Sequence, residues 1–378
     1  MKNKKATISL SIIVKNESHV ILKMLNSVYT LLDYYVVVDT GSSDGTQDII
    51  KKFFDEKGIP GEIISHKWKN YGDARNVALE AIKGKADFGF WIDADDQLEI
   101  DNTIFDVEEF KLNLFKYDGI ICDYFNYWNF NHVSFFSTTQ PWKWFGALHE
   151  TLECEKSNVN LGYSDGLRIV QYSTGSSWQN PNKWQDYVDM MEDFMLTTDI
   201  DHFLYPRWLY YMGQTYAEVG NLVKALEFYE KRSIIKNGQE DIYISLMKIA
   251  DLKHRLGYDI NDVICSYLKC TKEIPYRVEH LIPVINYYNI IGDYHTAYIY
   301  SSYAMRFAGK VPEKSLLVDS SVYIWKIYDL HNISSWWSGR VDEAKETFVK
   351  LWVQVERGLV TNKDDVERLT ANKYCNIP

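Results

Sequence analysis

The sequence has no excess of positive charge, no long apolar run and no cysteine pair at metal-binding spacing. Its 52 acidic residues outnumber its 41 basic residues, giving a net charge of −11, which argues against binding to nucleic acid or to an anionic membrane. No stretch approaches the roughly 18 apolar residues that a membrane span requires. The five cysteines include no C-x-x-C pair, so neither a zinc knuckle nor a disulfide framework is evident. We therefore expect a reduced, cytoplasmic protein.

Apolar runs of strand length alternate with helical patterns over the first hundred residues. The predicted strands cover residues 8–14, 34–39, 62–68 and 87–93. Strands that are apolar throughout and separated by helices indicate a parallel sheet covered on both faces. The predicted fold class of this part is therefore α/β and Rossmann-like, with a mostly parallel sheet.

Polar residues follow three of these strands at their carboxyl ends. They are Lys15 to Glu17 after the first strand, Asp39 at the end of the second, and Asp93 to Asp96 after the fourth. Ligands of open α/β sheets bind at the carboxyl ends of the strands. The three clusters are therefore expected to meet at one edge of one sheet.

The aspartates Asp93, Asp95 and Asp96 repel one another unless something neutralises them. An EF-hand loop beginning at Asp93 would need Gly and Glu where Leu98 and Ile104 stand. A glycosidase needs two carboxylates several ångströms apart, which one tight turn does not supply. A solvated turn explains poorly why the cluster follows a buried strand. Mg²⁺ or Mn²⁺, held by one or two carboxylates and completed by a diphosphate, accounts for it best.

The remainder of the chain divides into a β-rich segment, a loose segment and a helical segment. Residues 118–154 are aromatic and partly alternating, residues 155–182 carry several glycines, and the sequence is helical from there on. A five-residue step from Gly to Ala recurs in the helical part, with Gly257 marking a weaker unit; the pairs are Gly220 and Ala225, Gly292 and Ala297, and Gly339 and Ala344. This spacing is typical of tetratricopeptide repeats, although an unrelated helical bundle is the alternative. The predicted domains are residues 1–180 and 181–378.

Four ordered motifs resemble one known family. "ISLSIIVKNES", "VVVDTGSSDGT", "YGDARNVALE" and "WIDADDQ" are similar in order and spacing to the GT-A domain of family-2 glycosyltransferases. The later "WKWFGALHE" resembles the segment of the subgroup whose catalytic domain precedes tetratricopeptide helices. The resemblance implies a metal-dependent, inverting hexosyl- or N-acetylhexosaminyltransferase. Its expected donor is a nucleotide-diphospho-sugar, with UDP as the nucleotide, and its expected acceptor is a glycan or a peptide.

The resemblance also implies roles for individual residues. Asp39 would accept a hydrogen bond from the base, and Arg75 would contact the nucleotide or its phosphates. The implied nucleotide-sugar-binding residues are Lys15, Asn16, Glu17, Asp39, Arg75, Asp93, Ala94 and His149. Mn²⁺ or Mg²⁺ is the implied cofactor, with Asp95, Asp93 and His149 as its implied ligands.

An inverting enzyme needs one general base to deprotonate the acceptor, and the resemblance points to Glu150. The sequence departs from the family after this point. Relatives often carry a His–Gly pair where this chain has Gln171 and Tyr172, which weakens any metal or phosphate role for a histidine there.

Three other classes of protein are compatible with parts of this sequence. An inactive transferase-like scaffold would use only its helices for binding, but Arg75, Asp93, Asp95 and Glu150 are intact. A nucleotidyltransferase would usually carry an early Gly-rich, basic loop, which is absent. The "DTGS" around Asp39 matches an aspartic protease, but its flanks are α/β rather than all-β. The helical domain could bind the acceptor or form a homodimer.

Overall fold

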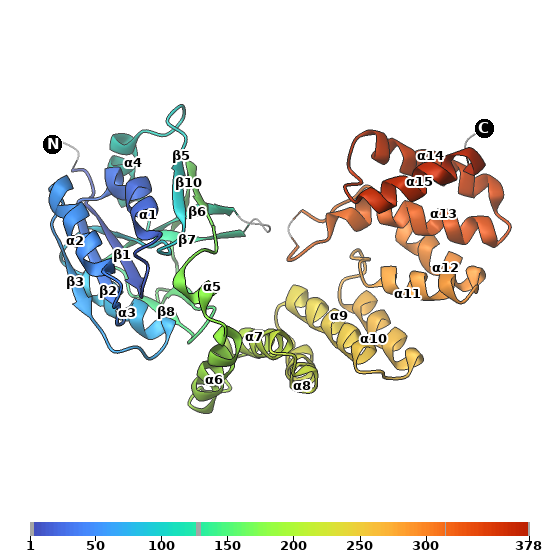
Figure 1. The fold of residues 1–378 in the computed structure, drawn as a ribbon, viewed down its shortest axis with the longest axis horizontal. Helices are drawn as coiled ribbons and strands as arrows, with labels where there is room; N and C mark the ends of the chain where they lie inside the picture. Colours follow the sequence, from blue (N-terminus) through green and yellow to red (C-terminus); the bar gives the residue numbers. More distant parts are fainter. Residues whose placement is uncertain (1–3, 126–129, 314, 377–378) are drawn as a thin grey trace. The chain divides into compact units, whose positions relative to one another are not determined.

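The computed structural model describes residues 4–125, 130–313 and 315–376. The chain divides into two compact units, Met1–Thr198 and Asp199–Pro378 (Figure 1). The sequence predicted a division between residues 180 and 181, before helix α6 (Lys183–Leu196). This helix instead belongs to the first unit, because the Tyr187 hydroxyl lies 3.0 Å from the Tyr71 hydroxyl of helix α3.

The first unit is built on an eight-stranded sheet in the order β3-β2-β1-β4-β7-β6-β10-β5. Strands β3, β2, β1 and β4 pair in parallel, and β7 joins them antiparallel. A separate antiparallel pair consists of β8 and β9. The strands are β1 (Ile8–Val14), β2 (Tyr34–Asp39), β3 (Gly61–Ser65), β4 (Phe88–Phe90), β5 (Gln97–Ile100), β6 (Gly119–Phe125), β7 (Phe130–Ser137), β8 (Trp142–Phe145), β9 (Thr151–Cys154) and β10 (Leu161–Val170).

Apolar layers cover both faces of the sheet, as the uniformly apolar strands predict. Successive residues of β2 show this, because Val37 belongs to the core with α1 and α2 while Val36 and Val38 belong to the core with α3. The helical elements of this unit are α1 (Ile21–Val28), η1 (Tyr29–Leu31), α2 (Thr46–Lys57), α3 (Tyr71–Ala81), α4 (Val107–Asn113), η2 (Leu114–Lys116), α5 (Ser176–Gln179) and α6. The predicted α/β class with a mostly parallel first half is confirmed.

The prediction of a loose segment over 155–182 is wrong, because this segment contains β10. Its glycines serve packing and a bulge rather than a loop. A Cβ at Gly162 would lie 2.9 Å from the ring of Tyr117. Gly166 has a φ of +82° and lies where the pairing of β10 with β6 shifts register. Glycine permits close approach and bulges within strands, so its presence alone does not exclude one.

The second unit consists of paired antiparallel helices, which confirms the tetratricopeptide-like prediction. The glycines between paired helices have positive φ values of 76° to 85°. Ala225, Ala297 and Ala344 are fully buried, as close helix packing requires. The elements are α7 (Tyr205–Glu218), α8 (Leu222–Ser233), α9 (Gln239–Arg255), α10 (Ile260–Glu273), α11 (Leu281–Ile290), α12 (Tyr294–Met305), η3 (Val322–Lys326), α13 (Ile327–Trp337), α14 (Val341–Glu356) and α15 (Lys363–Asn376).

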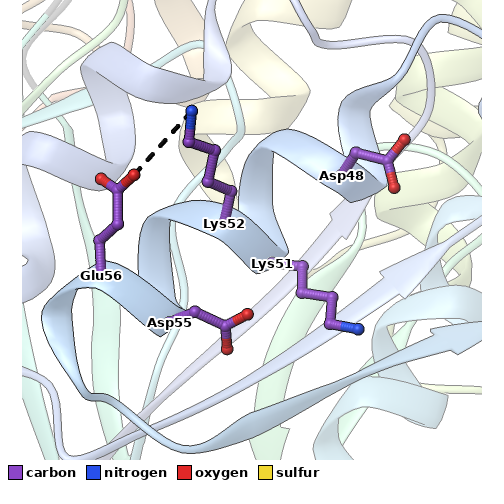
Figure 2. Close-up of a pocket in the computed structure, with 5 residues that line it drawn as sticks. All are labelled: Asp48, Lys51, Lys52, Asp55 and Glu56. Carbon is purple, nitrogen blue, oxygen red and sulfur yellow. Dashed lines mark ion pairs between the residues drawn. The ribbon is translucent and has the colours of Figure 1, made fainter.

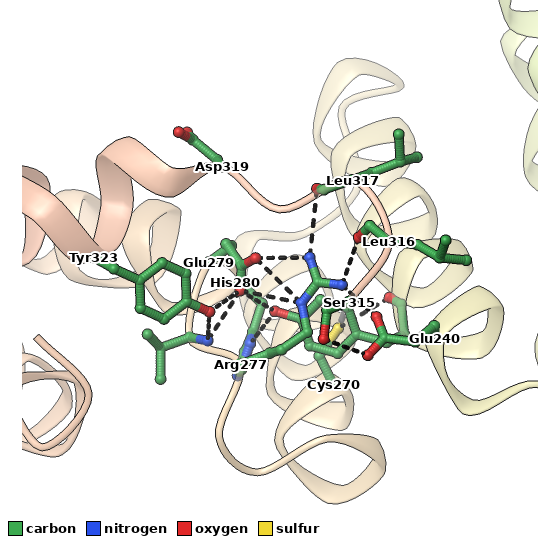
Figure 3. A network of polar contacts seen from close by, with 12 residues as sticks. Glu240, Cys270, Arg277, Glu279, His280, Ser315, Leu316, Leu317, Asp319 and Tyr323 are labelled. Carbon is green, nitrogen blue, oxygen red and sulfur yellow. Dashed lines mark hydrogen bonds and ion pairs between the residues drawn. The ribbon is translucent and has the colours of Figure 1, made fainter. Parts of the chain in front are cut away.

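A buried polar network lies inside the second unit (Figure 3). At its centre the Arg277 guanidinium donates to Glu279 at 2.6 Å, to Glu240 at 2.5 Å and to the Leu316 carbonyl oxygen at 2.7 Å. Glu279 also accepts from the Tyr323 hydroxyl at 2.6 Å. The network joins α9 and the start of α11 to the segment before η3.

No helix in the described part of the chain combines the length and the apolar character that crossing a membrane requires.

Candidate active site

The carboxyl ends of β1, β2 and β4 meet at one edge of the sheet. Val14 pairs with Asp39, and Leu10 pairs with Phe90. The three polar clusters that follow these strands therefore start from neighbouring positions. This is the convergence that the sequence predicted.

Asp39 ends β2, and only one of the two oxygens of its buried carboxylate accepts hydrogen bonds within the described chain. Its Oδ1 accepts from the backbone N–H groups of Gly41 and Ser42, both at 2.8 Å. Its Oδ2 is buried without a hydrogen-bond partner in the described chain, and the residue is 1% exposed. A buried acceptor without a donor is costly, so this oxygen is suited to an N–H group of a ligand.

The segment after β1 is tied to the loop after β2. The Asn16 backbone N–H donates to the Ser42 hydroxyl at 2.9 Å, and its side-chain oxygen accepts from the Ser43 N–H at 2.8 Å. Asn16 has a φ of +57°, a strained value that the two hydrogen bonds maintain. The exposed Lys15 contributes its carbonyl oxygen, which accepts from the Ser176 hydroxyl at 2.6 Å.

Arg75 of α3 bridges two of the predicted site carboxylates. Its Nη2 donates to Asp93 Oδ1 at 2.5 Å and its Nε donates to Glu150 Oε1 at 2.6 Å. The guanidinium also lies over the rings of Trp91 and Trp144, at 4.8 and 4.9 Å from their centroids. Burial alone would lower the pKa of Arg75, but Asp93 and Glu150 raise it. Arg75 is therefore a permanent buried cation, and it contacts Glu150, which lies 75 positions later in the sequence.

Helix α3 also positions the segment that carries Glu150. The Asn76 side chain donates to the Trp144 carbonyl oxygen and accepts from the Trp144 N–H, both at 2.9 Å. Gly72 lies so close to the Gly146 carbonyl oxygen that any Cβ there would clash with it. The glycines of "YGDARN" and "WKWFGALHE" thus allow the two motifs to dock on each other.

Asp95 and Glu17 are held by one loop, the segment between β10 and α5. The backbone N–H groups of Thr174 and Gly175 donate to Asp95 Oδ2 at 2.8 and 2.7 Å. The Ser176 N–H and hydroxyl donate to Glu17 Oε1 at 3.1 and 3.0 Å. Burial raises the pKa of Glu17, while Ser176 lowers it and Asp95 raises it. This loop brings residues 174–176 to the strand-end carboxylates.

Asp96 is the most deeply buried of the three neighbouring aspartates. It is 1% exposed, and neither carboxylate oxygen has a hydrogen bond of good geometry within the described residues. Burial raises its pKa to about 9, and Asp93 and Asp95 add to the rise, whereas the Tyr172 backbone and Arg75 oppose it. Burial and the two neighbouring carboxylates thus favour the protonated form of Asp96.

The strand-end carboxylates do not form a complete protein cage for a metal ion. Among the described residues no three His, Cys, Asp or Glu side chains are arranged to hold one. Asp93 Oδ2 and Asp95 Oδ1 take no part in the contacts above, and Asp93 is 37% exposed. Two available carboxylate oxygens fit Mg²⁺ or Mn²⁺, which usually completes its shell with phosphate and water. The predicted participation of His149, which has a φ of +51°, remains a prediction.

The sequence analysis missed several residues of this site. Thr174, Gly175 and Ser176 bind through backbone or hydroxyl groups, which leave no composition signal. Ala94, predicted to bind the nucleotide-sugar, is buried in the apolar core, so only its backbone could do so. The loop "YSTGSS" could have been noticed as a small-residue segment of the kind that approaches polar ligands closely.

A separate hollow of about 460 Å³ lies on the outer face of α2. Its five lining side chains are exposed and of mixed charge, and Lys52 pairs with Glu56 at 4.0 Å (Figure 2). All five come from one helix, and none belongs to the cluster at the strand ends. Such a hollow is a solvated helix face rather than a site.

Comparison with known proteins supports the motif analysis. Residues 9–140 match the family model described as glycosyl transferase family 2. Two curated relatives are each 28% identical over 240 residues, covering 61% of this chain and 54% of the relative. They are the SPbeta prophage-derived glycosyltransferase SunS of Bacillus subtilis (strain 168) and glycosyltransferase SunS of Bacillus phage SPbeta. The chain thus spans about half the length of these relatives.

Solved structures align with the two parts of the chain at low similarity. S. aureus TarS 1-349 in complex with UDP-GlcNAc is 13% identical, with a TM-score of 0.32 over 65% of this chain and 81% of that one. A tetratricopeptide repeat protein from Parabacteroides merdae ATCC 43184 is 18% identical, with a TM-score of 0.36 over 52% and 70% of the two chains. The match to the family model identifies residues 9–140 as a glycosyl transferase family 2 domain, and tetratricopeptide-like helices follow in the second unit.

Proposed function

We propose that this protein is an inverting glycosyltransferase that moves a sugar from a UDP-sugar to a glycan or peptide acceptor. The observation that carries the proposal is the bridge from Asp93 through Arg75 to Glu150, next to Asp95 at the carboxyl edge of the sheet. It combines a permanent cation, carboxylates for a metal and a carboxylate for proton transfer in one place.

The nucleotide end of the donor is assigned to the loop after β2. The buried Asp39 Oδ2 lacks a donor, and an imide N–H of uracil would supply one. Lys15, Asn16 and Glu17 lie at the end of the neighbouring strand and would border the same nucleoside. A pyrimidine with an N–H at this position is therefore the expected base.

Transfer is proposed to proceed in one displacement. The acceptor nucleophile forms a bond to the anomeric carbon while the bond to the diphosphate oxygen breaks, and the electron pair leaves with UDP. The acceptor proton passes to Glu150, which Arg75 holds in a fixed orientation. Arg75 also offers positive charge to the departing diphosphate, since preformed charge stabilises a developing anion.

Asp95 and Asp93 are proposed to hold Mn²⁺ or Mg²⁺ together with the diphosphate. A metal ion of this kind supplies Lewis-acid stabilisation to a phosphate leaving group. The chain's own part is to present two carboxylate oxygens at a fixed edge of the sheet. Two further predictions concern the sugar and the assembly. The transferred unit is a hexose or an N-acetylhexosamine, and the helical unit either binds the acceptor or forms a homodimer.

A donor screen tests the proposal. UDP-, GDP- and dTDP-sugars are incubated with the full-length protein with Mn²⁺, and nucleotide release is measured by chromatography with and without EDTA. We expect UDP release that requires the metal. An inactive scaffold would release nothing, and a nucleotidyltransferase given a sugar phosphate and UTP would release pyrophosphate; either result would reject the proposal.

A further inference from the structure

Lys183 is a buried cation without an anionic partner. It is the first residue of α6 and is 7% exposed. Its amine lies over the Trp178 ring at 3.0 Å from the centroid, with Trp184 at 5.1 Å and Tyr187 at 5.6 Å. The side-chain amine forms no ion pair or hydrogen bond with another described residue, whereas the backbone N–H donates to the Asn180 carbonyl oxygen at 3.2 Å. Aromatic faces stabilise a buried ammonium only in part, so the charge remains available to an anion.

The aromatic cage of Lys183 stands beside the candidate active site. The backbone N–H of Trp178 donates to the carbonyl oxygen of Gly175, whose own N–H donates to Asp95 at 2.7 Å, so the ring beneath the Lys183 amine is carried by the segment that holds Asp95. Burial lowers the pKa of Lys183 to about 8, and Asp95 opposes this by raising it. The Tyr187 hydroxyl lies 3.0 Å from that of Tyr71. Glu150 in turn raises the pKa of both tyrosines. Tyr71 and Arg75 both belong to α3, so the cage contacts the helix that carries the Arg75 bridge.

Trp178 forms the most exposed wall of the cage. Its ring is 51% exposed, whereas Trp184 and Tyr187 are half-buried. The short helix α5 that carries Trp178 directly follows the residues that donate to Asp95, so this wall is continuous with the segment that borders the candidate active site.

We propose that Lys183 binds the diphosphate of the nucleotide-sugar donor. The inference rests on the proposed function, because a diphosphate next to Asp95 is the anion that this function requires. Lys183 and Arg75 would then flank the diphosphate from two elements, α6 and α3. When the bond from the anomeric carbon to the diphosphate oxygen breaks, the electron pair stays on that oxygen and both cations stabilise it. Low local polarity around the aromatic rings strengthens this attraction.

The test is the substitution Lys183→Met, which keeps the length of the side chain and removes its charge. Affinities for UDP and for pyrophosphate are measured by calorimetry with Mn²⁺, and the affinity for uridine by NMR titration. Loss of a charge-assisted contact should weaken UDP and pyrophosphate by about 10- to 100-fold and leave uridine unchanged. Lys183→Arg should restore most of the affinity.

A matched control is Lys57→Met in the same unit, because Lys57 also lies over aromatic rings, those of Tyr29 at 4.4 Å and Phe53 at 5.5 Å. This variant should bind all three ligands like the wild type. Wild-type UDP affinity in Lys183→Met, or an equal loss for uridine, would overturn the assignment of Lys183 alone. Failure of the wild-type protein to bind any nucleoside diphosphate would instead overturn the proposed function, and the assignment with it.

Discussion

Each unit of this protein contains a buried arginine between two carboxylates, and the two arrangements differ in how completely they are satisfied. Arg277 of the second unit is 1% exposed, and its partner Glu279 also accepts from Tyr243 and Tyr323 (Figure 3). The side chains of Asp93 and Glu150, in the first unit, accept from Arg75 alone within the described chain. The Arg277 network is closed, whereas the Arg75 network leaves carboxylate oxygens available.

The difference shows what distinguishes a structural ion pair from a reactive one. Every extra donor around Glu279 offsets the cost of burying its charge. The carboxylates near Arg75 have fewer donors. Asp93 remains 37% exposed, and Asp39 and Asp96 have buried oxygens without hydrogen bonds of good geometry. Unsatisfied polar groups gathered at one place indicate a site that a ligand completes.

The largest effect is expected from removal of the arginine in the closed network. Arg277→Met leaves Glu279 buried without its counter-charge and should reduce the free energy of unfolding by about 3–5 kcal/mol. Chemical denaturation followed by circular dichroism measures it. Lys231→Met, which removes an exposed ion pair with Glu227, is the control and should cost at most about 1 kcal/mol. Equal losses in both variants would mean that the network contributes no special stability.

The next effect concerns the open arrangement. Glu150→Gln keeps the shape of the side chain but cannot accept a proton, so transfer should fall by about 10²- to 10⁴-fold while UDP binding persists. Glu153→Gln on β9 changes a carboxylate three positions away and should retain transfer. Full activity of Glu150→Gln on a genuine acceptor, measured as glycosylated product by mass spectrometry, would place the base elsewhere.

A smaller effect is expected at the base pocket. Asp39→Asn retains an acceptor for Gly41 and Ser42 but replaces the unpaired oxygen with an N–H donor. UDP affinity should fall by about 10- to 100-fold, whereas pyrophosphate affinity should not change. Calorimetry with both ligands decides this, and parallel losses would show that Asp39 does not contact the base.

At neutral pH the smallest effect is a pH dependence that arises in the closed network, because it develops only below pH 6.5. His280 is fully buried, and burial, followed by Arg277, lowers its pKa to about 3, against 6.5 when unfolded. The unfolded chain therefore binds the extra proton between these values, and the stability is complete above pH 6.5 and falls as the pH drops towards 3. The slope from one group is at most about 1.4 kcal/mol per pH unit. His280→Gln should reduce the pH dependence of the free energy of unfolding between pH 6.5 and 3. An unchanged pH dependence in this variant would show that His280 is not its cause.

The sequence predicted local features well because their causes are local. The residues of β1 and β2 are mostly apolar, and both strands form with the predicted bounds. In each repeat the glycine forms the turn between two helices and the alanine packs between them. Both features are local, so the sequence predicts them without knowledge of the tertiary fold. The carboxyl-edge cluster also follows from strand order, because parallel strands end at the same edge.

Tertiary structure alone decided which of these groups touch one another. Nothing in the spacing of Arg75, Asp93 and Glu150 fixes their distances, which depend on Asn76 and Gly72 docking β8 and its following loop onto α3. The amides that bind Asp95 come from a backbone that any residue could supply. Lys183 gave no signal in the sequence, because a lysine at a helix start is ordinarily exposed, and only the fold brings three aromatic rings around its amine.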